Sequence, residues 1–150
     1  MTPVERRVFG LLCLLVVLTG TAYGWMKYVV VNPDPLAVVN HPWQGAMQAT
    51  HVLAGPAILL MFGVLLRSHI LKKIAQARVR KRLSGFTSLA TFAVMAVSGY
   101  ALQVVTHEAA LRALVIIHVA SGAVFAVAYL AHLVALVPAR RRRADIREAA

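Results

Sequence analysis

Four histidines stand at positions where they could bind a metal-containing cofactor. His51, His118 and His132 fall within apolar stretches, and His69 follows one of these stretches at its charged end. An ionisable side chain inside a membrane-spanning segment is costly, so such residues are functional candidates. Cys13 is the single cysteine. A disulfide, zinc or iron–sulfur site therefore cannot be built from the thiols of this chain alone.

The spacing of these histidines fits two cofactors stacked between helices. His118 and His132 are 14 residues apart, which on one helix means about 40° around the axis and about 21 Å along it. His51 and His69 are 18 residues apart, or about five turns and 27 Å. Two neutral imidazoles from facing helices make a six-coordinate haem suited to electron transfer. The spacing predicts an outer haem b on His51 and His118 and an inner haem b on His69 and His132.

Glycines could provide the gaps that a flat macrocycle needs between helices. Six glycines are candidates for binding the cofactors: Gly10, Gly24, Gly55, Gly85, Gly99 and Gly122. The first two are 14 residues apart, as are Gly85 and Gly99, and Gly55 and Gly122 each follow a proposed ligand by four residues. We expect Gly24 and Gly99 at the depth of the outer haem, and Gly10 and Gly85 at the inner one. These glycines could also serve close helix packing alone.

Four apolar stretches must position these residues. The chain of 150 residues is 60% hydrophobic and 14% charged, with a mean hydropathy of +0.73, which indicates lipid as its solvent. We predict helices at about 8–31, 46–66, 86–106 and 111–137, with a kink at Pro56 and a stop at Pro138 and the arginines after it. The first stretch is longer than the core of a signal peptide and is predicted to be a retained helix. The expected fold is an all-α, integral membrane four-helix bundle forming one domain, 1–150.

The basic residues alternate with the apolar stretches. Of 16 lysines and arginines, 14 precede the first stretch, follow the fourth, or lie between the second and third. The positive-inside rule then predicts that both termini and the middle loop are cytoplasmic. Clusters in these positions also attract anionic lipid. The net charge of +11 is therefore explained by membrane topology and by a lipid bilayer as partner, and no nucleic acid partner is expected.

Three segments of the chain resemble a known family: HVLAGP from His51, SGFTSLATFAVMAVSGYALQ from Ser84, and HVASGAVFAVAYLAH from His118 to His132. They are similar to the four-helix membrane cytochrome b subunits of bacterial formate dehydrogenases and nickel–iron hydrogenases. The resemblance implies two haems b, two of whose ligands lie on the fourth helix, in a multi-pass protein of the bacterial inner membrane. It also implies an electron-transfer subunit of an oxidoreductase complex, with a quinone pool or a periplasmic or membrane-attached redox protein as partner. In the formate dehydrogenase type the first helix provides an inner ligand, and here His69 would replace it.

Other interpretations of the same residues remain open. The histidines could hydrogen-bond between helices in a haem-free membrane scaffold or assembly subunit, and His69 could be an interfacial residue of the basic cluster. A proton-coupled carrier would need acidic partners, and none of the predicted spans contains a carboxylate. Arg67 and Arg112 could bind haem propionates or simply sit at the membrane interface. We expect His41 and His107 on outer loops.

Overall fold

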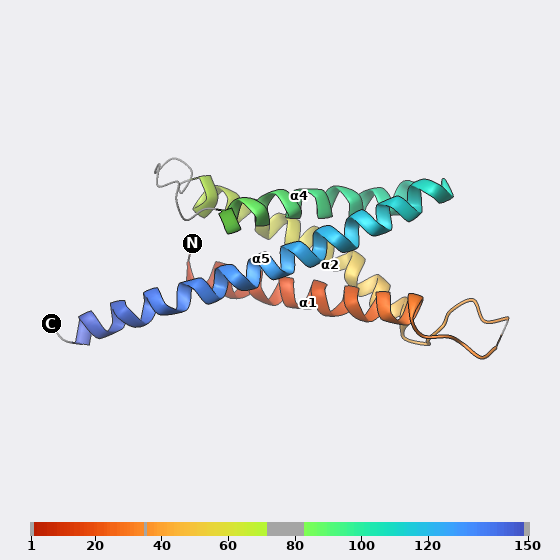
Figure 1. Cartoon of the computed structure of the whole chain (residues 1–150), viewed down its shortest axis with the longest axis horizontal. Coiled ribbons are helices and arrows are strands. Elements are labelled where there is room, and N and C mark those ends of the chain that lie inside the picture. Colours follow the sequence, from red (N-terminus) through yellow and green to blue (C-terminus); the bar gives the residue numbers. More distant parts are fainter. Residues whose placement is uncertain (1, 35, 72–82, 149–150) are drawn as a thin grey trace. The chain divides into compact units, whose positions relative to one another are not determined.

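The computed structural model describes residues 2–34, 36–71 and 83–148, and is helical wherever it has regular structure (Figure 1). Its elements are α1 (Pro3–Tyr28), α2 (Gln44–Leu65), the short π-helix η1 (Leu66–Ile70), α4 (Leu83–Val104) and α5 (Glu108–Glu148). The side chains of residues 69, 70, 83–85, 132 and 135–148 lie outside the description. No strand occurs in the described ranges. The predicted all-α fold class is confirmed.

Four of these helices are long and apolar enough to cross a membrane. The candidate spans are Pro3–Tyr28, Gln44–Ser68, Phe86–Val104 and Glu108–Ala131, with mean hydropathies of 1.9, 2.0, 1.3 and 2.2. At most 17% of the apolar window in any of them is buried inside the protein. Apolar side chains that face outward along a whole helix need lipid around them. The chain is a multi-pass membrane protein with helices close to the predicted ranges.

Helix α1 begins with a reciprocal cap. The Glu5 backbone N–H donates to Thr2 Oγ1 at 3.1 Å, and the Thr2 N–H donates to Glu5 Oε2 at 2.7 Å. This capping box satisfies two of the N–H groups that have no partner within the helix. Pro3 occupies the first turn, where its missing N–H has no cost. The helix therefore begins five residues earlier than the apolar stretch suggested.

The connection between α1 and α2 is ordered by side chains that accept backbone hydrogen bonds. The Asp34 N–H donates to Asn32 Oδ1 at 3.0 Å, and the Leu36 N–H donates to Asp34 Oδ1 at 2.9 Å. Such short polar side chains are typical turn formers. Asn40 Nδ2 donates to the Lys27 carbonyl at 2.9 Å, which ties the connection back to the end of α1. α2 therefore returns beside α1.

The contacts divide the chain into two compact units, Met1–Ala77 and Arg78–Ala150. In the first, α1 packs against α2, and the Phe9 and Phe62 rings lie 6.4 Å apart. In the second, α4 packs against α5, and the Phe92 and Phe125 rings lie 5.5 Å apart. Each pair is antiparallel, because residues later in the first helix meet residues earlier in the second: Gly20 meets His51, and Gly99 meets His118. We call these units the N-terminal and the C-terminal hairpin. The single-domain organisation stays a prediction.

Two details differ from the expected helix pattern. The helix α2 contains Pro56, whose predicted kink stays a prediction, and an irregular turn that was not predicted follows α2, in the π-helix Leu66–Ile70. Inserted π turns are rare and occur frequently at functional sites. The prediction that Pro138 ends the last helix is wrong, since α5 continues to Glu148. Arginine is a strong helix former, so the basic stretch after the proline can stay helical beyond the apolar span.

Candidate histidine sites

His51 on α2 is held against the backbone of α1. Its Nδ1 lies 3.0 Å from the Val16 carbonyl oxygen and 3.4 Å from Thr19 Oγ1. The ring also covers Gly20, where an added Cβ would stand only 2.7 Å from His51 Cε1. That distance is too short for any side chain, so the imidazole occupies the space that glycine leaves open. The side chain is half-buried.

His118 on α5 has the same kind of environment in the C-terminal hairpin. Its Nδ1 lies 3.0 Å from the Met95 carbonyl oxygen and 3.2 Å from Ser98 Oγ. An added Cβ at Gly99 would stand 2.9 Å from His118 Cε1. The Ser98 hydroxyl donates to the Met95 carbonyl at 3.1 Å, so hydroxyl, carbonyl and imidazole form one small network.

These contacts fix the tautomer of each imidazole. A carbonyl oxygen can only accept a hydrogen bond, so the nitrogen 3.0 Å from it carries the proton and donates. Protonation at Nδ1 puts the ring lone pair on Nε2. A histidine whose Nδ1–H is bound by a backbone carbonyl is the arrangement that orients metal-ligating histidines. In both His51 and His118, Nε2 is therefore the nitrogen whose lone pair a metal could use.

The structure describes five of the six glycines predicted to bind the cofactors, and their surroundings differ. An added Cβ at Gly99 would meet the ring of His118, and an added Cβ at Gly122 would make an ordinary contact of 3.5 Å with Met95 Sδ. An added Cβ at Gly24 or Gly55 would meet nothing within 4 Å. These two glycines are therefore not required by packing within their hairpin. Gly10 lies half-buried in α1.

Two residues missed in the sequence, Gly20 and Thr19, complete the environment of His51. Gly20 contacts this histidine, whereas Gly24, one turn further along α1, does not. The signal was present as a dipeptide: Thr19-Gly20 in the first stretch has the same pattern as Ser98-Gly99 in the third, a hydroxyl residue followed by glycine. The 14-residue spacing from Gly10 predicted Gly24, and not Gly20, as the glycine near the outer haem. Gly85 lies outside the described side chains.

The inner pair is described at the level of the backbone only. His132 lies on α5, 14 residues after His118 in an uninterrupted helix, as predicted. His69 lies in the π-helix, so the simple count of five α-helical turns from His51 does not apply. A π turn holds roughly one residue more than an α turn, so the position of His69 is rotated around the helix axis away from the face predicted for it. The side chains of both histidines lie outside the described part of the chain.

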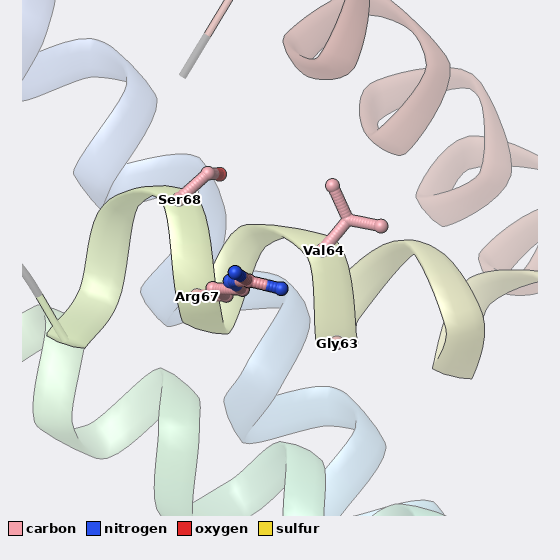
Figure 2. A pocket seen from close by; sticks show the side chains of 4 residues that line it. All are labelled: Gly63, Val64, Arg67 and Ser68. Atoms are coloured by element: carbon pink, nitrogen blue, oxygen red, sulfur yellow. The ribbon is translucent and has the colours of Figure 1, made fainter.

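A hollow of about 660 Å³ opens next to His69, where α2 passes into η1. Figure 2 shows the four residues that line it, Gly63, Val64, Arg67 and Ser68. Ser68 Oγ is buried and has no hydrogen-bond partner among the described residues. A buried hydroxyl without a partner is costly, and together with the Arg67 guanidinium it provides donors for an anionic group.

The other predicted polar residues lie at helix ends or in connections. Arg112 forms an ion pair with Glu108 one turn earlier on α5, and both side chains are more than 70% exposed. An exposed pair of this kind contributes little stability, so it leaves Arg112 able to exchange partners. His41 and His107 lie outside the helices, as expected. The described ranges contain no group of three or more histidine, cysteine or acidic side chains that could hold an ion.

The residues present fit a haem. A haem iron needs only two protein ligands, because the macrocycle itself supplies the other four, so clusters of three side chains are not required. Each hairpin offers one oriented imidazole, and Gly24 and Gly55 leave open surface in the N-terminal hairpin. The hollow near Arg67 and Ser68 has donors for a carboxylate.

Comparisons of the chain with protein-family models, with curated proteins and with solved structures find no match.

Proposed function

We propose that this chain is a membrane-bound di-haem b-type cytochrome subunit that carries electrons between a redox partner or quinone pool and another carrier. One observation carries the proposal: His51 and His118 each donate Nδ1–H to a backbone carbonyl at 3.0 Å, which leaves the lone pair of each ring on Nε2. This is the preparation that a histidine ligand to iron requires. Neutral imidazoles of this kind are the common axial ligands of haem.

His51 and His118 ligate the outer haem, and His69 and His132 ligate the inner one. A bound haem supplies one-electron chemistry at its iron. The histidines would hold the iron through Nε2, two to each haem, and would leave no position on the metal for a substrate. The carbonyls of Val16 and Met95 hold the protons on Nδ1 and increase the basicity of the ligands.

At the inner end, Arg67 and Ser68 bind a haem carboxylate. The Ser68 hydroxyl gains in this way the partner that it lacks within the described chain, and Arg67 provides a charge-assisted hydrogen bond. Arg112 has the corresponding role at the outer rim, exchanging Glu108 for the propionate. Gly10, Gly24, Gly55, Gly85 and Gly122 leave room along the helices for the macrocycles, and Gly99 leaves room for the ring of the ligand His118.

The chain lies in a bacterial inner membrane with both termini in the cytoplasm. Basic residues at the start of α1, between α2 and α4, and after the apolar part of α5 favour this orientation. The outer haem then lies near the periplasmic side, where a periplasmic or membrane-attached redox protein exchanges electrons with it. A quinone exchanges electrons at the other end of the pair.

One alternative function is favoured by the same hydrogen bonds. A haem-free scaffold or assembly subunit could use His51 and His118 only to join the two helices of each hairpin, since each imidazole already links its helix to the preceding one. This alternative predicts a colourless protein. It also predicts that asparagine or glutamine, which can donate to the same carbonyl, replaces either histidine without loss of function.

The test is a reduced-minus-oxidised visible spectrum and a pyridine haemochrome count on the purified protein. Wild type is expected to contain two haems per chain. His51→Ala and His118→Ala are each expected to lose the same haem, and His132→Ala to lose the other. His107→Ala serves as the control, because this residue lies in the connection before α5, and it should keep both haems. A wild type that contains no haem when haem is abundant during expression would refute the cytochrome and favour the scaffold.

A further inference from the structure

The two hairpins hold their histidines with the same set of atoms in the same order along the helix. The first helix of each provides a backbone carbonyl, a hydroxyl three residues later and a glycine directly after it, and the second helix provides the histidine. In the N-terminal hairpin these residues are Val16, Thr19, Gly20 and His51. In the C-terminal hairpin they are Met95, Ser98, Gly99 and His118. Corresponding distances agree within a few tenths of an ångström: 3.0 and 3.0 Å to the carbonyl, 3.4 and 3.2 Å to the hydroxyl.

The correspondence extends to the core of each hairpin. Equivalent residues are 79 positions apart on the first helices and 67 positions apart on the second, because the connection 29–43 is 12 residues longer than the connection 105–107. Applying these two offsets pairs buried residues with buried residues: Cys13 with Phe92, Thr19 with Ser98, Ala54 with Ser121, and Ile58 with Phe125. The glycine one turn after each histidine, Gly55 or Gly122, is also repeated.

The histidine has a similar position along the second helix of each hairpin. His51 lies seven residues after the start of α2 and His118 ten residues after the start of α5, so each is about 10–15 Å from the connected end of its own hairpin. Within its hairpin, each histidine is therefore held at an equivalent place.

We infer that the chain is a tandem repeat of one histidine-holding hairpin, and that Thr19, Gly20, Ser98 and Gly99 are positioning residues that set the two ligands of a single iron in equivalent ways. The inference rests on the proposed haem function. The glycine lets the imidazole lie against the backbone. The hydroxyl shares Nδ1–H with the carbonyl and donates its own proton to the helix backbone, so it holds the plane of the ring.

The repeat does not extend to the inner haem. His132 follows His118 by 14 residues, and the residue 14 positions after His51 is Leu65, which is buried. The N-terminal hairpin therefore has no histidine at the equivalent inner position, and the π-helix Leu66–Ile70 follows at that point. The two histidines proposed for the outer haem would therefore be held in equivalent ways, whereas those proposed for the inner haem do not occupy equivalent positions of the two hairpins.

Alanine at either glycine tests whether the two hairpins form one centre. An added Cβ would stand 2.7 Å from the ring of His51 at Gly20 and 2.9 Å from the ring of His118 at Gly99, so each ring must move. Gly20→Ala and Gly99→Ala should both reduce the occupancy of the haem that is lost in His51→Ala, and should keep the other haem. The retained inner haem reports that each variant is folded. Gly45→Ala is the control, since an added Cβ there meets nothing within 4 Å.

Exchanging the hydroxyl residues tests their positioning role. Thr19→Val and Ser98→Ala should keep two haems per chain but shift the low-spin electron paramagnetic resonance signal and the midpoint potential of the outer haem. Thr19→Ser and Ser98→Thr place in each hairpin the residue of the other, and both should retain the wild-type signal. Rescue by the equivalent residue is not expected if the hydroxyl only fills space.

The outcomes separate this inference from the proposed function. A wild type without haem overturns both. If wild type contains two haems but Gly20→Ala and Gly99→Ala remove different ones, the inferred repeat is overturned and the proposed cytochrome function stands. Unchanged outer-haem signals in Thr19→Val and Ser98→Ala overturn the positioning role.

Discussion

Gly20 offers a test of the N-terminal hairpin that needs no cofactor. An added Cβ would stand 2.7 Å from His51 Cε1 and 2.9 Å from Nδ1. Carbon atoms in contact are separated by about 3.5 Å or more, so in Gly20→Ala the ring must retreat by about 0.8 Å. The hydrogen bond from Nδ1 to the Val16 carbonyl, now 3.0 Å, then exceeds hydrogen-bonding distance.

The expected change in stability combines two opposing terms. An interhelical hydrogen bond in a membrane protein contributes about 0.6 kcal/mol on average and up to about 1.7 kcal/mol. Alanine is favoured over glycine inside a helix by about 1 kcal/mol. Gly20→Ala should therefore leave the free energy of unfolding within about 1 kcal/mol of wild type. Gly24→Ala, on the same helix with nothing within 4 Å of the added Cβ, should gain the full helix term.

The informative quantity is the difference between these two variants. Gly20→Ala should be about 0.6–1.7 kcal/mol less stable than Gly24→Ala, which is about a 3- to 16-fold difference in the unfolding equilibrium constant. Reversible unfolding of haem-free protein by sodium dodecyl sulfate in mixed micelles, followed by far-ultraviolet circular dichroism, measures it. In a His51→Ala background the two glycine variants should become equal, since the ring is absent. Equal stability of the two variants in the wild-type background would refute the contact between Gly20 and His51.

Three further predictions concern the rest of the molecule. Phe125→Ala removes two ring contacts, at 5.5 and 5.9 Å, and should lower the free energy of unfolding by about 1–3 kcal/mol in the same assay, whereas Val127→Ala, whose side chain is 68% exposed, should change it by less than about 0.5 kcal/mol. Cys13 is 5% exposed, so N-ethylmaleimide should modify it only after denaturation, and rapid modification of the native protein would contradict its burial. Green fluorescent protein fused after Ala150 should fluoresce, because the predicted C-terminus is cytoplasmic, and an export-dependent alkaline phosphatase fusion there should be inactive.

The helices could be predicted because the signals for them are local. A stretch of about 20 apolar residues spans a membrane whatever its neighbours are, and proline or charge marks its ends. Where the helix ends differ from the prediction, the cause is a local feature of the sequence that is easily misjudged. The capping box of Thr2 and Glu5 begins α1 earlier, and arginine-rich sequence continues α5 after Pro138. The π-helix at Leu66–Ile70 has no simple sequence signature, and it changes the register of His69.

The sequence by itself determined the membrane class and the four spans, and it singled out the four histidines that we propose as ligands, because composition and helical periodicity act over one helix at a time. Only the tertiary structure decided which glycine lies under which histidine. That choice depends on the rotation and axial shift of one helix against another, which places Gly20 rather than Gly24 beneath His51. The similarity of the two hairpins also became visible only there, since few of their paired residues are identical and the correspondence lies in burial and hydrogen bonding around His51 and His118.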